Sequence, residues 1–248
     1  PGVANTTLAA TDFNLINTTS PGLLGRGIMS SNRGPAITTV TNGEVKTVGG
    51  LDGSGNSAIA ILAETLGPST GNALAQVNGT KVSTTGPSAI GILAVTGFLG
   101  AVTGGGARVE ASGITLSTTG TNAQGLYALG VTANTAPIDI IFTSGTVETQ
   151  GTNSTAVQAV TQGGPITVDI QAAAQVTANG VGANGVVASG PASANVTINN
   201  AGKIKSAQAD GINISAALKG GIITSSGDIS GATAAVRGSP AADTFTAS

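Results

Sequence analysis

The stretches GPSAIGILA (residues 86–94) and GTNAQGLYA (residues 120–128) decide the fold, because they are two copies of one phrase. Similar copies are GNSAIAILA at residues 55–63 and GVGANGVVA at residues 180–188. Including weaker copies, the phrase returns eight times, beginning at Gly22, Gly55, Gly86, Gly120, Gly151, Gly180, Ser206 and Ser230. A repeat every 24–34 residues is typical of a solenoid built from stacked structural units.

Stacking the copies gives columns with different chemistry. The sixth place is always tiny: Gly27, Ala60, Gly91, Gly125, Ala156, Gly185, Gly211 and Ala235. The seventh place is always aliphatic: Ile28, Ile61, Ile92, Leu126, Val157, Val186, Ile212 and Val236. The eighth place varies freely: Met29, Leu62, Leu93, Tyr127, Gln158, Val187, Asn213 and Arg237. This alternation predicts a strand whose seventh place faces inward and whose eighth place faces outward.

The sequence between copies holds two further strand-like words. Residues 138–142 (IDIIF) followed by 145–149 (GTVET) are an example, so each repeat is predicted to contain three short strands. The last word has an inward column of Val45, Val82, Leu116, Val147, Val176, Ile204 and Ile229. Gly, Asn and Pro separate the words, and Pro87, Pro137, Pro165 and Pro191 are expected in the connections.

These observations predict an all-β fold, a right-handed single-stranded parallel β-helix of roughly eight three-strand coils, about 40 Å long at ~4.8 Å per coil. The repeats span residues 22–238, residues 1–21 form an N-terminal segment or cap, and residues 239–248 form a C-terminal tail or begin a further coil. Shortening of the repeat toward the C-terminus is expected to occur in the loops. A β-sandwich is the rival fold, but it has no reason to repeat one phrase at every third strand.

Composition narrows the classes of function. Only 8% of residues are charged, the net charge is −2, and the basic residues are scattered, so nucleic acid is not an expected partner. No apolar run is long enough to cross a bilayer. The chain lacks Cys and His, which excludes disulfides, a Ser-His-Asp triad and imidazole or thiolate metal sites. We therefore expect no catalytic, cofactor or metal site.

The phrase NAQGLYA (residues 122–128), with its echoes at residues 88–94 and 183–188, resembles the recurring motif of bacterial autotransporter passengers of the pertactin and AIDA adhesin type. The resemblance covers about residues 22–238. It implies a cell-surface or extracellular adhesin or stalk, exported across the outer membrane, associated with autoaggregation and biofilms. The anchoring membrane β-barrel is expected outside this chain.

The third word provides the candidate interaction face, because its outward columns hold seven of the twenty charged residues of the chain. The candidate residues are Glu44, Lys46, Lys81, Ser83, Thr115, Ser117, Thr146, Glu148, Lys203, Lys205 and Asp228. This polar face could bind a second copy, rod to rod, or a host or matrix surface. The alternative is a merely solvated face. Association of the rods end to end is a further possibility, since an exposed terminal coil leaves an unpaired sheet edge.

Three other functions remain open. An extracellular β-helix enzyme acting on polysaccharide would need two carboxylates within about 10 Å in a groove, drawn from Glu44, Glu64, Glu110, Asp139, Glu148 and Asp169. A filament-forming structural protein would use the same rod. An ice- or surface-templating protein would need an uninterrupted exposed Thr array, built from words such as VSTT (residues 82–85) and LSTT (residues 116–119).

Overall fold

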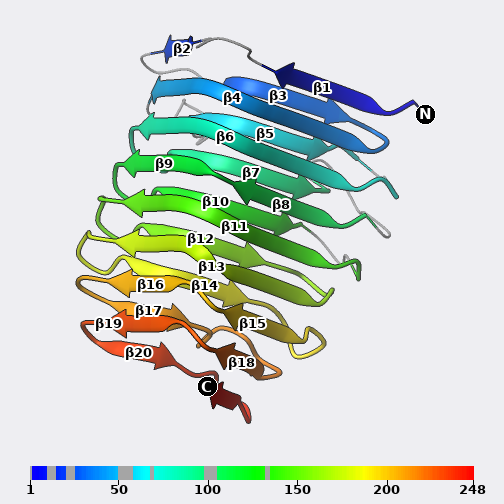
Figure 1. The fold of residues 1–248 in the computed structure, drawn as a ribbon. Helices are drawn as coiled ribbons and strands as arrows, with labels where there is room; N and C mark the ends of the chain where they lie inside the picture. The colour runs from blue at the N-terminus through cyan, green and yellow to red at the C-terminus, as the bar shows by residue number, and fades with distance from the viewer. Residues whose placement is uncertain are drawn as a thin grey trace.

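The chain forms a rod in which parallel strands stack into two long sheets, with the two termini at opposite ends (Figure 1). This computed structural model describes residues 2–9, 15–20, 26–49, 58–67, 70–97, 105–131 and 135–248. Every strand pairing in these ranges is parallel, and the ranges contain no helix. The prediction of an all-β parallel solenoid is confirmed.

Sheet A is the larger of the two sheets and contains thirteen strands. They are β1 (Ala4–Ala9), β2 (Leu15–Ser20), β4 (Ala36–Gly49), β6 (Ala73–Thr85), β8 (Ala107–Ser112), β9 (Ile114–Thr119), β11 (Ile138–Thr149), β13 (Ile166–Ala178), β15 (Val196–Asn200), β16 (Lys203–Ser206), β18 (Gly221–Ser225), β19 (Asp228–Gly231) and β21 (Thr244–Ala247). These strands hold the second and third words of each repeat. The last of them, β21, pairs with β18 and so adds a further rung to the sheet.

Sheet B contains eight strands, each formed by one copy of the phrase. They are β3 (Arg26–Asn32), β5 (Ile59–Thr65), β7 (Ile90–Thr96), β10 (Gln124–Gly130), β12 (Thr155–Val160), β14 (Asn184–Ser189), β17 (Asp210–Asn213) and β20 (Ala234–Arg237). The aliphatic seventh place forms the predicted ladder, because Ile61 pairs with Ile92, Ile92 with Leu126, and Leu126 with Val157.

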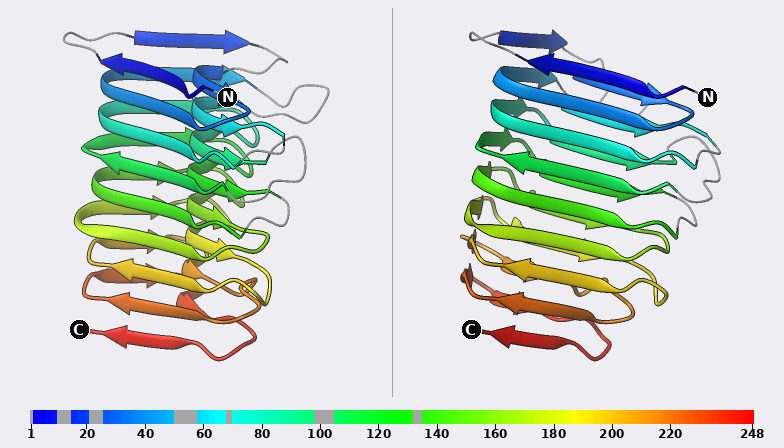
Figure 2. Two further views of the ribbon diagram at one scale, coloured as in Figure 1. Left: turned by 90° about the vertical axis from the view of Figure 1, so that its right-hand side faces the viewer. Right: turned by 45° about the vertical axis from the view of Figure 1, so that its right-hand side comes forward.

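The winding of the chain follows from the two sheets. In Figure 1 the chain crosses sheet A toward the left in front, returns toward the right through sheet B behind it, and descends from the N-terminus to the C-terminus. This is the predicted right-handed path, the hand that parallel crossovers almost always take. Figure 2 shows the same stacking from two other sides, with each coil directly below the preceding one.

The prediction of roughly eight coils with three strands each differs somewhat from the structure. In β4, β6, β11 and β13 the second and third words form one strand of 12–14 residues instead of two short ones. The irregularity between them survives as a register shift near Phe142 and Ser144, where β11 pairs with β13. The words form separate strands at β8 and β9, β15 and β16, and β18 and β19, and β1 and β2 likewise pair separately with the two halves of β4. Backbone pairing therefore continues through the bend between the second and third words, where the sequence predicted two separate strands.

The core is a single narrow column of aliphatic side chains between the two sheets. Ile61, Ile92, Leu126 and Val157 are all fully buried, and the largest buried side chain is Phe142, in the inward register that its word indicated. The tiny sixth place has a steric cause. A Cβ added to Gly125 would lie 2.4 Å from the carbonyl oxygen of Ala156 and 2.6 Å from Cγ1 of Val147.

A ladder of buried threonines runs beside this aliphatic column. Thr47, Thr84, Thr118 and Thr149 occupy one register position on successive strands of sheet A. Each is at most 1% exposed, and none of their hydroxyl groups has a hydrogen-bond partner in the described part of the chain. Of the two threonines in each of the words VSTT and LSTT, one is therefore buried. The exposed threonine array that surface templating would need is correspondingly half as large.

The outer side of sheet B is more apolar than the free variation of the eighth place indicated. A second cluster, separate from the core, contains the buried residues Ile59, Leu62, Ile90, Leu93 and Val95, with Tyr127, Leu129 and Val131 packed against it. Burial raises the pKa of Tyr127 to about 12. In β5 and β7 the eighth place therefore points away from the core and is nevertheless shielded from solvent.

The sequence predicted that the repeat shortens toward the C-terminus in its loops. In the structure the strands shorten as well. The strands of sheet B fall from seven residues in β5, β7 and β10 to four in β17 and β20. The expected proline positions are correct, since Pro87, Pro137, Pro165 and Pro191 all lie outside strands.

Candidate functional site

The predicted interaction face forms two straight columns on the outer side of sheet A. In strand order the first column is Glu44, Lys81, Thr115, Thr146, Gln175, Lys203 and Asp228. The second column is Lys46, Ser83, Ser117, Glu148, Thr177, Lys205 and Ser230. Every one of these side chains is exposed or half-buried. We call these fourteen residues the third-strand face.

Several charged groups from the N-terminal end to the middle of the third-strand face already have partners. The Lys81 ammonium lies 3.1 Å from the Glu44 carboxylate. Glu148 accepts a hydrogen bond of 2.8 Å from the Asn179 side chain and another of 2.9 Å from Gln150. These contacts are largely exposed, so each stabilises the fold only weakly.

The C-terminal half presents a basic pair, Lys203 and Lys205, on β16. Both side chains are exposed. Within the described ranges, no carboxylate lies within 4.0 Å of either ammonium, although Asp228 is the register neighbour of Lys203. These two lysines therefore keep their charge available for a partner.

A groove lies on the other half of the same sheet, over β4, β6, β8 and β11. It consists of two adjoining hollows of about 430 and 550 Å³ that share Arg108 and Glu110. One hollow is lined mainly by hydroxyl and amide side chains, including Thr39, Gln76 and Thr143. The other is more apolar, and its lining includes Leu74, Pro137 and the carboxylate of Asp139. We call the two hollows together the Arg108 groove.

The charges in and beside the Arg108 groove form a small network. Nη2 of Arg108 lies 2.7 Å from Oε1 of Glu110, and the Gln76 amide donates a 2.9 Å hydrogen bond to the other oxygen of Glu110. Asp139 is the register neighbour of Arg108. Burial raises the pKa of Asp139, although the charge of Arg108 and a hydrogen bond with Thr167 act in the opposite direction. Asp139 is thus a partly dehydrated carboxylate without a bidentate partner.

Three carboxylates lie around Ile141, on β8, β11 and β13. Glu110 and Asp169 both align with Ile141, one strand on either side of β11, and Asp139 lies two residues before Ile141. At ~4.8 Å between strands and ~3.3 Å per residue, the Cα atoms of Asp139 and of each other acid are about 8 Å apart. The sequence suggested that acids from different coils could lie close together; Glu110, Asp139 and Asp169 lie on three neighbouring strands, but Ile141 separates Glu110 from Asp169 in their column. Glu44, Glu64 and Glu148 lie elsewhere.

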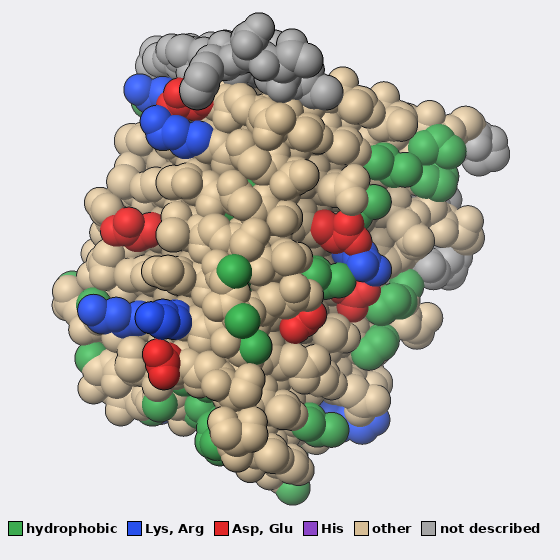
Figure 3. Space-filling view, in the orientation of Figure 1, with side chains coloured by type: hydrophobic (Ala, Val, Ile, Leu, Met, Phe, Trp, Pro, Cys, Tyr) green, Lys and Arg blue, Asp and Glu red, His purple; other side chains and the backbone are tan. Residues whose placement is uncertain are grey.

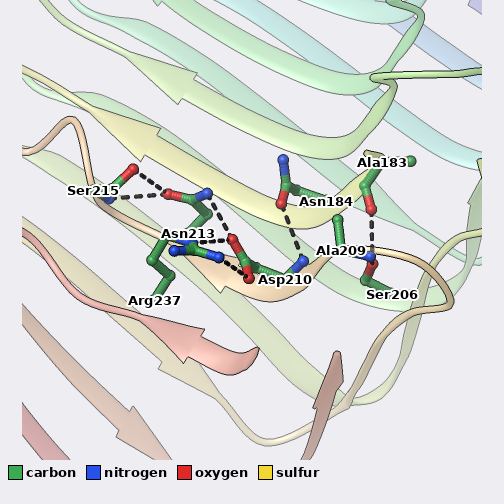
Figure 4. Close-up of polar contacts among 8 residues, drawn as sticks. All are labelled: Ala183, Asn184, Ser206, Ala209, Asp210, Asn213, Ser215 and Arg237. Carbon is green, nitrogen blue, oxygen red and sulfur yellow. Dashed lines mark hydrogen bonds and ion pairs between the residues drawn. The ribbon is translucent and has the colours of Figure 1, made fainter. Parts of the chain in front are cut away.

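A third polar cluster, around Asp210, ties together the coils near the C-terminus (Figure 4). Arg237 binds the Asp210 carboxylate with two nitrogens, at 2.5 and 3.1 Å, and Asn213 donates a further bond of 2.9 Å. The Asp210 backbone N–H bonds to the Asn184 side chain of the preceding coil. Because the Asp210 side chain is only 5% exposed, this cluster acts as a clamp between coils rather than as an open binding site.

Other chemistry is limited in the described ranges. No three His, Cys, Asp or Glu side chains are placed there to share a metal ion. Among the same residues, no helix exists that could span a membrane. Ser226, which follows Ser225 and precedes Gly227, lies in the turn between β18 and β19, and no helix follows it.

Sequence reasoning missed the Arg108 groove and the Asp210 clamp. Arg108 carried no motif, and the Asp210–Arg237 contact joins residues 27 positions apart. One signal was present: Asp210 and Arg237 both belong to copies of the phrase, on neighbouring strands of sheet B.

The chain matches no protein-family model, no curated protein and no solved structure.

Proposed function

We propose that this chain is a non-enzymatic structural or adhesive rod of the bacterial cell surface, which associates with copies of itself through the third-strand face. The observation that carries the proposal is the alignment of fourteen polar, solvent-accessible side chains in two unbroken columns on seven paired strands. The same columns could bind a host or matrix surface, and self-association is the form of the proposal that can be tested without knowing a receptor.

The physical basis of the proposal is the addition of weak contacts along a rigid support. Each exposed hydrogen bond or ion pair contributes between roughly 0 and 1 kcal/mol. A rod that presents such groups every ~4.8 Å forms many of them at once, since making one contact brings the next into reach. Low overall charge helps, because two such rods repel each other little.

Export to the cell surface is the second part of the proposal. Two sequence properties support it: the phrase of sheet B resembles that of autotransporter passengers, and the chain lacks Cys. A protein without Cys can cross an oxidising compartment unfolded without trapping wrong disulfides. In this proposal the rod holds its outer faces away from the membrane, while the anchoring element belongs to another part of the protein.

The experiment that tests self-association is sedimentation velocity over a range of concentrations, at low and high salt. We expect the mass of the wild type to rise with concentration. Thr115→Arg with Thr146→Arg places two charges in the middle of the third-strand face, at exposed positions, and should weaken association. The matched control adds the same charge elsewhere, through Val181→Arg with Leu218→Arg, which are 60% and 56% exposed. A wild type that stays monomeric throughout contradicts the proposal.

A polysaccharide-degrading enzyme is the second candidate, and the three carboxylates near the Arg108 groove favour it. Glu110 would be the second carboxylate and Asp139, with its raised pKa, the proton donor. The geometry supports this candidate less well, because Glu110 already accepts bonds from Arg108 and Gln76. Release of reducing ends from a panel of polysaccharides, abolished by Asp139→Asn and by Glu110→Gln, would establish it in place of the first.

A further inference from the structure

Two groups of opposite charge lie side by side on one face of the rod. Figure 3 shows basic side chains over β16 at the left of this face, with acidic side chains above and below them, and acidic side chains around a basic one over β8, β11 and β13 at the right, at overlapping heights along the rod. The basic group is the pair Lys203 and Lys205, and the acidic group is Glu110, Asp139 and Asp169 with Arg108 among them. In a chain with only 8% charged residues, such a separation is a strong local feature.

The acidic side of this face lacks enough positive charge of its own. Three carboxylates against one guanidinium leave a formal charge of −2. Arg108 is engaged by Glu110. Asp169 accepts a 3.3 Å hydrogen bond from Gln171, which is neutral. Asp139 and Asp169 therefore lack a cation within 4.0 Å in the described ranges.

The basic side is complementary in number and spacing. Lys203 and Lys205 lie two residues apart on β16, so their Cα atoms are about 7 Å apart at ~3.3 Å per residue. Asp139 and Asp169 are about 8 Å apart by the same measure. Long, flexible lysine side chains easily absorb this small difference. Asp228 beside Lys203 reduces the positive field without forming an ion pair in the structure.

From this complementarity we infer that the Lys203–Lys205 pair of one copy docks on Asp139, in the Arg108 groove, and on Asp169, beside the groove, of a second copy. This inference rests on the proposed self-association and names the surface that the third-strand face binds. Because both groups lie on one face at overlapping heights, rotating a copy by 180° about an axis parallel to the rod brings each pair opposite the other copy's groove. Both contacts then form within one symmetric dimer.

The groove strengthens these contacts in two ways. Charges that meet in a partly dehydrated hollow are screened less by salt than fully exposed ones. The hollows also have room for the lysine stems, whose methylene groups can pack against Leu74, Ile141 and Pro137. The dimer should still weaken with salt, because its ion pairs lie near the surface, but less than a dimer held by fully exposed ion pairs.

Charge exchange between two variants tests the inference directly. The first variant carries Lys203→Glu with Lys205→Glu, and the second carries Asp139→Lys with Asp169→Lys. Each variant alone should associate at least about tenfold more weakly than the wild type, because like charges then face each other. An equimolar mixture should recover association, since both contacts of the mixed dimer regain opposite charges. Sedimentation velocity of each sample at low salt measures this, and thermal melts confirm that each variant is folded.

A milder variant guards against misfolding of the second one. Asp139→Asn with Asp169→Asn keeps the side-chain shapes and should weaken association. Mixing it with the first variant restores only one of the two contacts, so the recovery should be smaller than that of the charge-exchanged mixture. If the wild type associates and both charge-reversed variants associate equally well, the docking inference is wrong while the proposed self-association stands. If the wild type is monomeric and the mixture is too, both fail together. If contacts were confined to the third-strand faces of the two copies, mixing the two variants would not restore association. Recovery in the mixture therefore supports docking at the acidic residues specifically.

Discussion

Thr118 stacks directly on Thr84 of the neighbouring coil, and both hydroxyl groups are buried without a hydrogen-bond partner in the described part of the chain. An unsatisfied buried hydroxyl costs about 1–3 kcal/mol. Valine has nearly the same shape as threonine and has no polar atom to satisfy. The ladder thus contains polar groups whose removal should strengthen the fold.

We predict that Thr118→Val raises the free energy of unfolding by about 1 kcal/mol. Thr38→Val is the matched control, because Thr38 is equally buried but its hydroxyl donates a 2.7 Å hydrogen bond to the Leu62 carbonyl. The control should be destabilised by about 1 kcal/mol. Urea unfolding of both variants provides the measurement. Destabilisation by both substitutions would show that Thr118 has a partner inside the rod, such as a water molecule.

Gly125→Ala should destabilise the rod by about 1–3 kcal/mol, through overpacking. The added Cβ would meet the Ala156 backbone and the Val147 side chain at less than 3 Å, and the backbone of a stacked coil cannot move away alone. Gly2→Ala is the control, since a Cβ there meets nothing within 4 Å. Equal melting temperatures for Gly125→Ala and the wild type would contradict the steric account of the tiny column.

Arg237→Ala should destabilise the C-terminal coils more than Asp210→Ala does. Removing Arg237 leaves the Asp210 carboxylate buried with the neutral Asn213 as its remaining side-chain partner. Removing Asp210 instead frees an arginine that is 45% exposed and easily hydrated. We therefore expect a larger fall in melting temperature for Arg237→Ala than for Asp210→Ala, because only the first leaves a buried carboxylate without its cation. A double-mutant cycle measures the coupling, and additive effects would show that no clamp exists.

Asp243 and Asp139 should affect acid stability in opposite directions. Burial acts to raise the pKa of Asp243, but hydrogen bonds donated by Ser239 and by the Gly221 backbone outweigh it and lower this pKa. Its contribution to stability is therefore present above the unfolded value of ~3.9 and is lost as the pH falls through the folded value. The raised pKa of Asp139 favours its protonated form in the folded state, so its ionisation reduces stability as the pH rises.

Two asparagine variants separate these effects in unfolding experiments between pH 2 and 7. Asp243→Asn should be less stable than the wild type at pH 7 and approach it at low pH. Asp139→Asn should equal or exceed the wild type at pH 7. The prediction for Asp139 fails if its asparagine variant loses stability at neutral pH.

The repeat predicted the fold closely because each inward column of the sequence is also a column in space. Ile61, Ile92, Leu126 and Val157 needed no information beyond their place in the phrase. The third-strand columns were equally readable, since side chains alternate with period two. In contrast, the phrase does not show whether a bend interrupts pairing. The merging of two words into β11 depends on backbone geometry around Phe142 and Ser144.

The candidate sites were less predictable, because they depend on outward residues that the repeat does not constrain. Glu110 and Asp139 belong to the second words of successive coils, and only the strand register placed them diagonally across the pairing of β8 with β11. A further signal was present in the third place of the phrase. Ser88, Asn122, Asn153 and Gly182 all have positive φ there. Such a column of Asn, Gly and Ser marks the left-handed turn into sheet B.

The strict pairing of each coil with its two neighbours has a consequence for how such a molecule can change. Paired residues lie about one repeat apart, such as Ala36 with Ala73 near one end and Ile222 with Thr244 near the other. If a whole coil is inserted or deleted, the remaining coils consequently still pair with a neighbour in the same way. Duplication of a single repeat in the gene would lengthen the rod without requiring compensating substitutions elsewhere, so reach can evolve independently of surface chemistry.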